Sequence, residues 1–289
     1  MNASKTGVLF FTEAMSTPAL IDYAKRMEEM DFTLWLPELF GREPFSTAGF
    51  VLANTSTLQV ATAIANVYVR DATSMAQTRR SLANLSEGRF GLGLGVSNAG
   101  LNQARGHEWT PPLPKLRSYL DEMEQATVQL PETAEAAPLY LAAHGPKLRE
   151  LAGQRADGVL TYLMVPEHTK LTRETLGPDK AISIVIFGLL CEDPDEARRL
   201  ARKSVKTYMS LDYYHREWRQ YGFTDEDFAN GGSDRLIDTL VAWGSPEQIR
   251  ARIGEHRQAG ASHVIVIPLN PAGGGREPHW PLLDALAEA

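Results

Sequence analysis

The side chains of this sequence that could carry out acid–base chemistry lie just after short apolar runs. Glu38 follows the run Leu34–Leu36, and its carboxylate could either transfer a proton or form an ion pair with nearby Arg42. Taken alone, the ion pair is the favoured interpretation, because opposite charges close in sequence commonly pair at surfaces. His107 lies in the loop ARGHEWTPP, where its imidazole could donate a proton, contact a substrate or face solvent.

A second kind of chemistry, anion binding, is suggested by the segment Ala142–Leu148, which runs from an apolar stretch into a helical pattern. Gly145 allows close approach to the backbone, and the amides of Lys147 and Leu148 fall in the first helical turn, where they lack backbone partners. His144 is placed to contact a ligand there or to bond its own turn. From spacing alone, a plain strand-to-helix turn is favoured over a phosphate site.

Metal and nucleophile chemistry find little support in the sequence. No set of His, Asp or Glu has the spacing of metal ligands, so we predict no metal. The lone cysteine, Cys191, ends an apolar run without a partner, and there is no G-x-S-x-G motif. The remaining histidines fall on predicted helices or at a strand end, where we expect a surface role: His168, His215, His256, His263 and His279.

The overall composition narrows the class of protein. The net charge of −7 and a pI near 5.6 give no electrostatic reason to expect nucleic acid or an anionic membrane as a partner. A single cysteine suits a reducing compartment, no segment is long and apolar enough to span a membrane, and the first residues lack a secretion-signal pattern. We therefore expect a cytoplasmic protein that acts on a small molecule.

The elements that position these residues alternate between strand and helix without a break in composition. Eight strand-like runs are expected, at 7–11, 34–36, 58–65, 89–96, 139–142, 158–162, 182–190 and 263–267. Helices are expected at 72–85, 116–130, 146–155, 166–176 and 280–287, and further helices are expected to begin at the N-caps Thr17, Asp193 and Ser245, the last two with a capping residue three positions on. Such a series predicts either an open doubly wound sheet or a closed barrel. The glycines at 91, 93 and 95 lie within a strand and lack G-x-G-x-x-G spacing, which argues against a Rossmann fold. We predict one (β/α)8 TIM barrel over residues 1–289, with a helical insertion before the last strand.

The stretch Leu58–Asn98 is the most informative part of that series, because it reads as a parallel βαβ unit. Gly91, Gly93 and Gly95 recur with a period of two, so all three lie on one face of their strand. A face without side chains leaves space, and we expect another group to fill it.

Seven segments follow one another along the chain: TLWLPELFGREPF, ATAIANVYVRD, LANLSEGRFGLGLGVSNAG, ARGHEW, AAHGPKLRELAGQRADG, GGSDRLIDTLVAWGSPEQI and AGASHVIV. In this order they resemble the bacterial luciferase-like flavin oxidoreductase superfamily. Within them, PELFGREPF, NVYVRD and RGHEW resemble the branch of probable coenzyme F420-dependent oxidoreductases.

The resemblance implies a barrel that binds a flavin or deazaflavin at the carboxyl ends of its strands, and a homodimer. It implies a non-proline cis peptide at or beside Ala63-Ile64, and it reverses the preference against phosphate at Gly145, Lys147 and Leu148. Ring contacts are implied at Asn66, Val96, Ser97 and Asn98. The full set of predicted cofactor-binding residues is Glu38, Ala63, Ile64, Asn66, Val96, Ser97, Asn98, His144, Gly145, Lys147, Leu148 and Tyr162.

The sequence departs from the similar deazaflavin sugar-phosphate dehydrogenases at two places. They carry an Asp-His pair after strand two and a glutamate after strand four, where this chain has Glu38-Leu39 and Asn98. Glu38 and His107 are thus the remaining catalytic candidates, and a sugar phosphate is not expected. The predicted activity is hydride transfer between coenzyme F420 and a small, apolar organic substrate. The alternatives are a reduced-FMN monooxygenase that uses dioxygen and a catalytically idle flavin-binding homologue.

Overall fold

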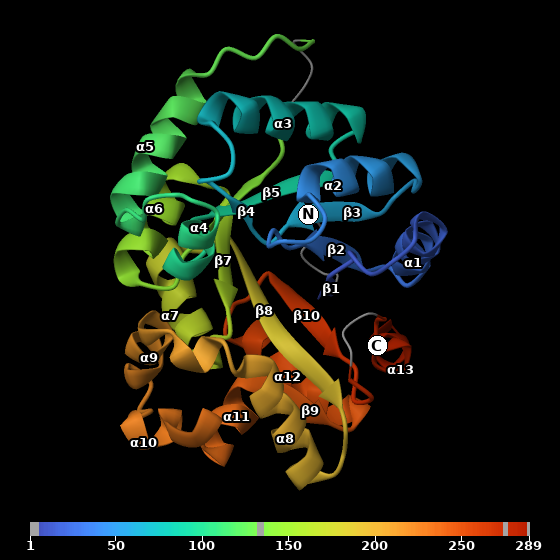
Figure 1. Ribbon diagram of the computed structural model, residues 1–289, viewed down its shortest axis with the longest axis vertical. Helices are drawn as coiled ribbons and strands as arrows, with labels where there is room; N and C mark the ends of the chain where they lie inside the picture. The colour runs from blue at the N-terminus through green and yellow to red at the C-terminus, as the bar shows by residue number, and fades with distance from the viewer. Residues whose placement is uncertain (1–5, 132–135, 274–276, 288–289) are drawn as a thin grey trace.

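Eight parallel strands close into a barrel in the computed structural model, which describes residues 6–131, 136–273 and 277–287 (Figure 1). Closure is made by β8 and β10, which pair from His263 opposite Ser183 to Leu269 opposite Leu189. The predicted TIM-barrel class is therefore confirmed. The barrel strands are β1 (Gly7–Leu9), β2 (Thr33–Leu36), β3 (Gln59–Thr62), β5 (Phe90–Gly95), β6 (Leu139–Ala142), β7 (Gly158–Tyr162), β8 (Ala181–Leu190) and β10 (His263–Leu269).

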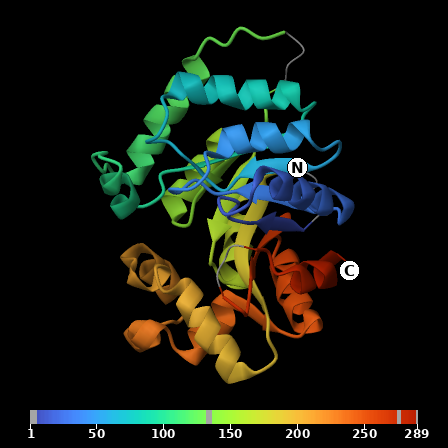
Figure 2. The ribbon, with the colours of Figure 1, turned by 45° about the vertical axis from the view of Figure 1, so that its right-hand side comes forward.

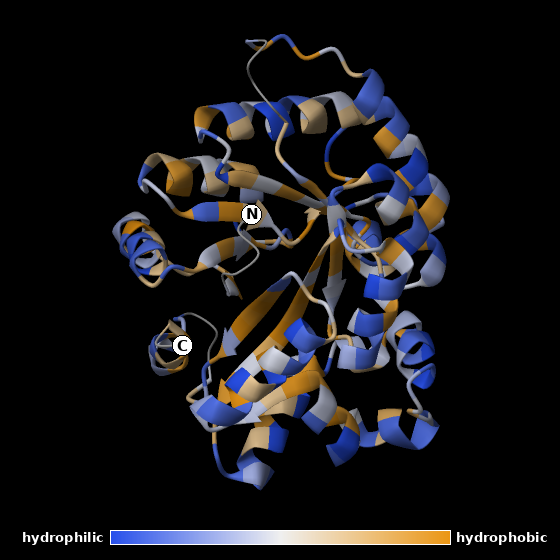
Figure 3. Ribbon diagram, turned by 180° about the vertical axis from the view of Figure 1, so that it is seen from behind, coloured by the Kyte–Doolittle hydropathy of each residue, from blue (hydrophilic) through white to orange (hydrophobic). Residues whose placement is uncertain are grey.

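Two further strands were not predicted. The short β4 (Ala65–Asn66) continues β3 after a break and pairs with β5, while β9 (Val241–Gly244) pairs with the last residues of β8. The first seven barrel strands each lead into a helix on the outside, and the helices present polar residues to solvent over a sheet of mostly apolar strands (Figure 3).

The helices of the N-terminal half are α1 (Thr17–Glu29), α2 (Pro44–Ala53), α3 (Ala72–Leu85), α4 (Ala99–Ala104) and α5 (Pro112–Gln125). Those of the C-terminal half are α6 (Pro146–Arg155), α7 (Pro166–Leu176), α8 (Pro194–Val205), α9 (Asp212–Arg219), α10 (Asp225–Phe228), α11 (Asp234–Leu240), α12 (Pro246–Gln258) and α13 (Trp280–Ala287). The predicted insertion before the last strand comprises α9, α10 and α11, which group with α8 at one end of the molecule (Figure 2).

Local capping explains where most helices begin. Asp193 accepts from the amide of Glu196 at the start of α8, and Ser245 and Gln248 form the predicted capping box of α12. The N-cap of α1 is Ser16 and not the expected Thr17. Helices α2 and α4 were missed because each lies in a stretch dense in turn residues, and α5 begins and ends earlier than the expected Leu116–Leu130.

Three histidines expected at the surface are buried instead. The side chains of His168, His256 and His263 are at most 3% exposed, and each has a hydrogen-bond partner inside the fold. His168 and His256 lie on the inner faces of α7 and α12, which the helix period alone could have indicated.

Candidate active site

A partly exposed patch, made by Ala63, Ile64 and Val96–Asn98, lies at the carboxyl ends of β3 and β5, next to strand residues that are buried. Ala63 and Ile64, which follow β3, are partly exposed, although Thr62 and Ala65 on either side are fully buried. Val96, Ser97 and Asn98 after β5 are likewise partly exposed. The peptide bond between Ala63 and Ile64 is cis, as predicted, and Ser97 has a positive φ of 57°.

The space beside the strand glycines is filled by the protein itself. A β-carbon on Gly93 would lie 2.0 Å from the carbonyl oxygen of Thr62, and one on Gly95 would lie 3.2 Å from Ile64 Cγ1 and 2.8 Å from the β-carbon of Ala142. Thr62 Oγ1 also bonds both the amide and the carbonyl of Gly93. The expectation that a separate group fills this space is therefore wrong here, because the glycines let β3 and Ile64 approach the strand closely.

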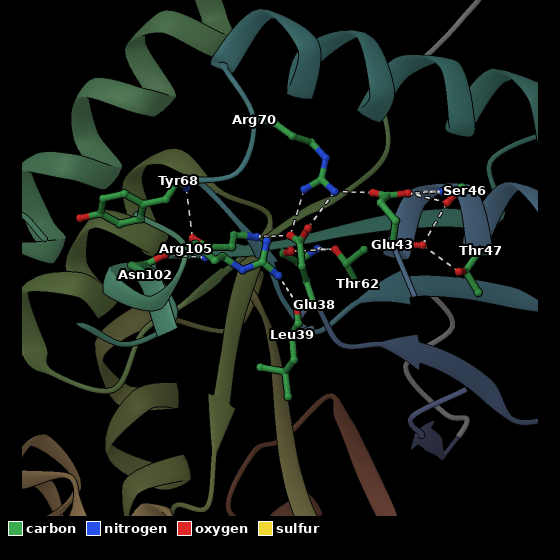
Figure 4. Close-up of polar contacts among 12 residues, drawn as sticks. Glu38, Leu39, Glu43, Ser46, Thr47, Thr62, Tyr68, Arg70, Asn102 and Arg105 are labelled. Carbon is green, nitrogen blue, oxygen red and sulfur yellow. Dashed lines mark hydrogen bonds and ion pairs between the residues drawn. The ribbon is translucent and has the colours of Figure 1, made fainter. Parts of the chain in front are cut away.

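Glu38 forms a buried ion pair (Figure 4). Its carboxylate is 5% exposed and accepts from Arg70, with N–O distances of 2.9 and 2.7 Å, and from the amide of Asn66 at 2.7 Å. Arg70 also pairs with Glu43. Arg42, the partner considered from the sequence, instead donates to the carbonyls of Thr12 and Met15.

A buried amide network joins the two sides of the patch. Asn66 donates from its side chain to Asn102 Oδ1 at 2.8 Å, and Asn102 Nδ2 donates to the carbonyls of Val96 and Asn98 at 2.7 and 3.0 Å. Both amides are completely buried, so Asn66 supports the patch from beneath. The Asn98 side chain caps α4 by accepting from Leu101. Sequence reasoning missed Arg70 and Asn102, although the spacing of Asn98 and Asn102 places them one helical turn apart.

His107 lies beside the patch within an aromatic group. Its ring centroid is 5.9 Å from that of Tyr68, which stacks on Trp109 at 5.8 Å. The His107 amide bonds the carbonyl of Asn102, which ties the loop to the network. Within the described residues, the His107 imidazole has no hydrogen-bond partner. The two catalytic candidates, His107 and Glu38, are therefore not hydrogen-bonded to each other.

The expected phosphate turn begins α6, one strand further along the barrel. Gly145 is its N-cap and supplies no side chain, so the first-turn amides have no side-chain cap. The amide of Leu148, expected to lack a backbone partner, instead donates to the carbonyl of Gly145 at 3.1 Å, because the first turn is tightened. The Lys147 side chain is exposed. His144 Nε2 accepts from the amide of Tyr162 at 3.1 Å. Burial, followed by the proximity of His168 and of the Arg149 guanidinium, lowers the pKa of His144 to about 3.

Tyr162 belongs to an aromatic cluster that the insertion lays over the ends of β6 and β7. Its hydroxyl bonds that of Tyr208 at 2.8 Å, and burial raises its pKa. Tyr213 of α9 stacks on His144 with ring centroids 6.2 Å apart, and Tyr214 contacts the same imidazole at 5.3 Å in a tilted arrangement. Trp218 donates to the carbonyl of Leu163 and is fully buried, so it is core and not pocket lining.

The strand register places the two parts of the site next to each other. Leu94 of β5 pairs with Leu141 of β6, so Val96–Asn98 and the α6 turn lie at adjacent strand ends. The described residues contain no group of three or more potential metal-ligating side chains, and none of their helices is long and apolar enough to cross a membrane. The arrangement places partly exposed residues of two strand ends beside a helix start that has no side-chain cap, which are the features expected where a nucleotide-like cofactor binds.

Comparison with known proteins identifies the class of barrel that this site defines. The model of the luciferase-like monooxygenase family matches residues 5–263, so the chain belongs to that family of oxidoreductase enzymes. It is 25% identical to the 5,10-methylenetetrahydromethanopterin reductase of Methanolobus tindarius, over 86% of this chain and 90% of the relative. The predictions of an enzyme and of this superfamily are therefore confirmed.

Solved structures with the same fold include one enzyme named as dependent on coenzyme F420 and one in complex with FMN. The coenzyme F420-dependent tetrahydromethanopterin reductase of Methanopyrus kandleri has a TM-score of 0.72 at 16% identity, covering 98% of this chain and 97% of its own. The oxygenating component of 3,6-diketocamphane monooxygenase of Pseudomonas putida, in complex with FMN, has a TM-score of 0.68 at 15% identity, covering 98% and 95%.

Proposed function

We propose that this protein transfers a hydride between coenzyme F420 and a small, apolar organic substrate. The observation that carries the proposal is the accessible patch at Ala63, Ile64 and Val96–Asn98, beside the uncapped start of α6. These residues fit a flat ring joined to a phosphate. Support for the deazaflavin comes from the reductases similar to this chain, one of which is named F420-dependent.

In this proposal the chain binds and orients the cofactor, and the bound deazaflavin supplies the hydride chemistry. Ala63 and Ile64 support the back of the ring, while Val96, Ser97 and Asn98 contact its edge. Asn66 and Glu38 act from beneath, because their polar atoms are occupied by Asn102 and Arg70. Gly145, Lys147 and Leu148 hold the phosphate, with His144 and Tyr162 bordering it.

Proton handling falls to His107 in preference to Glu38. The Glu38 carboxylate is buried and engaged by Arg70, whereas the imidazole of His107 is partly exposed and has no hydrogen-bond partner within the described residues. We expect His107→Gln to slow turnover by about 10²-fold or more, with cofactor affinity retained. Glu38→Gln should instead weaken cofactor binding and stability together. Steady-state kinetics with bound-cofactor titration separates the two roles, and unchanged turnover in His107→Gln would remove its assignment.

The apolar character proposed for the substrate rests on side chains around the patch. Trp109 stacks on Tyr68 next to His107, and Tyr213 faces the turn from α9. Both rings are partly exposed and can cover an apolar molecule while excluding water.

A reduced-FMN monooxygenase is the second candidate, favoured by the likeness to the FMN-bound oxygenase. An idle cofactor-binding homologue is the third, motivated by Glu38-Leu39 and Asn98 at the usual proton-transfer positions. Fluorescence titration with F420 and with FMN, oxidised and reduced, tests all three. Preference for FMN would overturn our proposal. Binding of a cofactor, with no turnover of any compound in a panel of carbonyls and alcohols, would favour the idle homologue.

The phosphate turn has its own test. Lys147→Ala should reduce affinity for F420 by about tenfold, because it removes one charge near the phosphate, while Lys170→Ala on the neighbouring helix α7 should not. Equal affinities in both variants would remove Lys147 from the site.

We also propose a cytoplasmic homodimer, which light scattering of the purified chain and fractionation of its host cells would check.

A further inference from the structure

A carboxylate from the insertion lies over the start of α6. A β-carbon on Gly145 would be 3.4 Å from Glu217 Oε1, so Glu217 of α9 occupies the space directly beside the uncapped first turn. This is an unusual neighbour for a turn expected to hold a phosphate, because like charges at such distances repel strongly in a partly dry site.

Glu217 belongs to α9, which packs against this turn. On the same helix, the rings of Tyr213 and Tyr214 contact that of His144, and the indole of Trp218 donates to the carbonyl of Leu163 at 2.9 Å. Glu217 itself bonds only Gln220 among the described residues. Its carboxylate is partly buried, and that burial raises its pKa although Arg149 acts in the opposite direction.

A buried positive charge, that of Arg149, also lies beside the turn. Arg149 is 3% exposed, its Nη1 donates to the carbonyl of His144 at 2.7 Å, and its Nε has no hydrogen-bond partner within the described residues. The turn is therefore flanked by one buried cation and one partly buried anion. Glu217 repels a ligand with two negative charges about twice as strongly as a ligand with one, because the Coulomb energy is proportional to the charge.

We propose that Glu217 is a specificity residue that discriminates against a phosphomonoester dianion and in favour of a phosphodiester monoanion at the start of α6. FMN ends in a phosphomonoester, which carries a charge between −1.5 and −2 near neutral pH by the usual second pKa of about 6. The phosphate of F420 is esterified on both sides and carries one charge. This inference rests on the proposed function, since it explains how the same fold selects the deazaflavin over FMN.

The test isolates the phosphate from the ring. Affinities are measured by fluorescence quenching at about pH 8 for FMN and for its phosphate monomethyl ester, each against riboflavin. The ester is a phosphodiester with one charge, so the two ligands differ only at the phosphate. We expect Glu217→Gln to raise the FMN-to-riboflavin affinity ratio by on the order of tenfold, and the ester-to-riboflavin ratio by about threefold or less. Glu226→Gln, an exposed residue of the same insertion, is the charge-matched control and should change neither ratio.

Equal changes of the two ratios in Glu217→Gln, or no change in either, would overturn the proposal. So would a failure of Glu217→Gln to bind FMN more tightly than the wild type. The proposed function fails separately, if the wild type prefers FMN to F420 or turns over no substrate with F420. A wild type that prefers FMN, together with a selective rise in its phosphate contribution in Glu217→Gln, would retain the specificity role and discard the F420 assignment.

Discussion

One buried amide, that of Asn102, connects the two chain segments that form the cofactor patch. It receives a hydrogen bond from Asn66 and donates to the carbonyls of Val96 and Asn98, while being fully buried. Removing it leaves the Asn66 amide group and two carbonyls without these partners, and each unsatisfied buried polar group costs about 1–3 kcal/mol. The Asn102 side chain thus fixes the positions of the residues that are proposed to contact the cofactor, although Asn102 itself is not expected to contact it.

Asn102→Ala should therefore lower the free energy of unfolding by about 2–4 kcal/mol and weaken cofactor binding. Gln103→Ala, the exposed neighbour on α4, is the control and should change stability by less than about 0.5 kcal/mol. Urea denaturation followed by circular dichroism measures both. If Asn102→Ala were as stable as the control, the amide network would not hold the patch.

At the level of residues, the sequence predicted the backbone features of the site correctly. It did not predict which side chains bond Glu38 and Asn66. The cis peptide at Ala63-Ile64 and the glycine-capped start of α6 are where the family resemblance implied. Arg70 and Asn102 were not foreseen, because their roles depend on which loops meet at the barrel mouth. That meeting is fixed by strand order and register, which local patterns do not contain.

At the scale of elements, β3 and β5 approach each other so closely that Gly93 has no room for a side chain. A β-carbon there would overlap the carbonyl of Thr62 at 2.0 Å. Gly93→Ala should destabilise the fold by about 3 kcal/mol or more, since backbone must move to accommodate it. Gly254→Ala on α12, where a β-carbon meets nothing within 4 Å, should instead raise stability by up to about 1 kcal/mol. Thermal unfolding of the two variants provides the comparison, and tolerance of Gly93→Ala would contradict the packing.

The packing of α7 on α12 makes stability depend on pH. Burial lowers the pKa of His168 to about 4 and that of His256 to about 3, and the imidazole of His256 bonds Thr169 at 3.0 Å. Both side chains are protonated in the unfolded chain below about pH 6.5 but stay neutral in the folded one. The unfolded state thus binds more protons as pH falls, and stability is lost from about pH 6.5 downward.

Between pH 7 and pH 5 we expect a loss of roughly 1–2 kcal/mol for each of these histidines. Urea denaturation of the wild type and of His256→Gln at the two pH values measures the loss. The substitution should reduce the pH dependence by about a third, whatever its effect at pH 7, because His144 and His168, whose pKa values are also lowered, still contribute. An identical pH dependence in both proteins would mean that His256 is not buried in its neutral form.

The predictions for elements succeeded where the period of apolar residues was regular. Helices α3, α6, α7 and α13 have the bounds that their apolar spacing predicted, and all eight barrel strands were foreseen. The elements that were missed lack a regular period of apolar residues. Helix α2 lies in a proline- and glycine-rich stretch, and β9 has four residues that gain strand character only by pairing with the end of β8.

At the scale of the whole molecule, the barrel joins residues from the beginning and end of the chain into one core. β1 lies between β2 and β10, and α1 and α13 are joined by an ion pair of 2.6 Å between Arg26 and Asp284. The guanidinium of Arg26 also lies 3.9 Å above the ring of Trp280. A closed barrel has no edge at which one half could separate without breaking pairs on both sides.

We therefore expect the predicted single domain to unfold as one cooperative unit. Hydrogen exchange under increasing urea, read separately for β2 and for β8, should give the same midpoint in both segments. Leu283→Ala, which removes a fully buried side chain of α13, should shift both midpoints together and cost about 2–5 kcal/mol, whereas Asp284→Ala should cost about 1 kcal/mol or less. Because β2 lies far from Leu283 in sequence, a shift confined to β8 would show that the two halves fold as separate units, and the one-domain description would then fail.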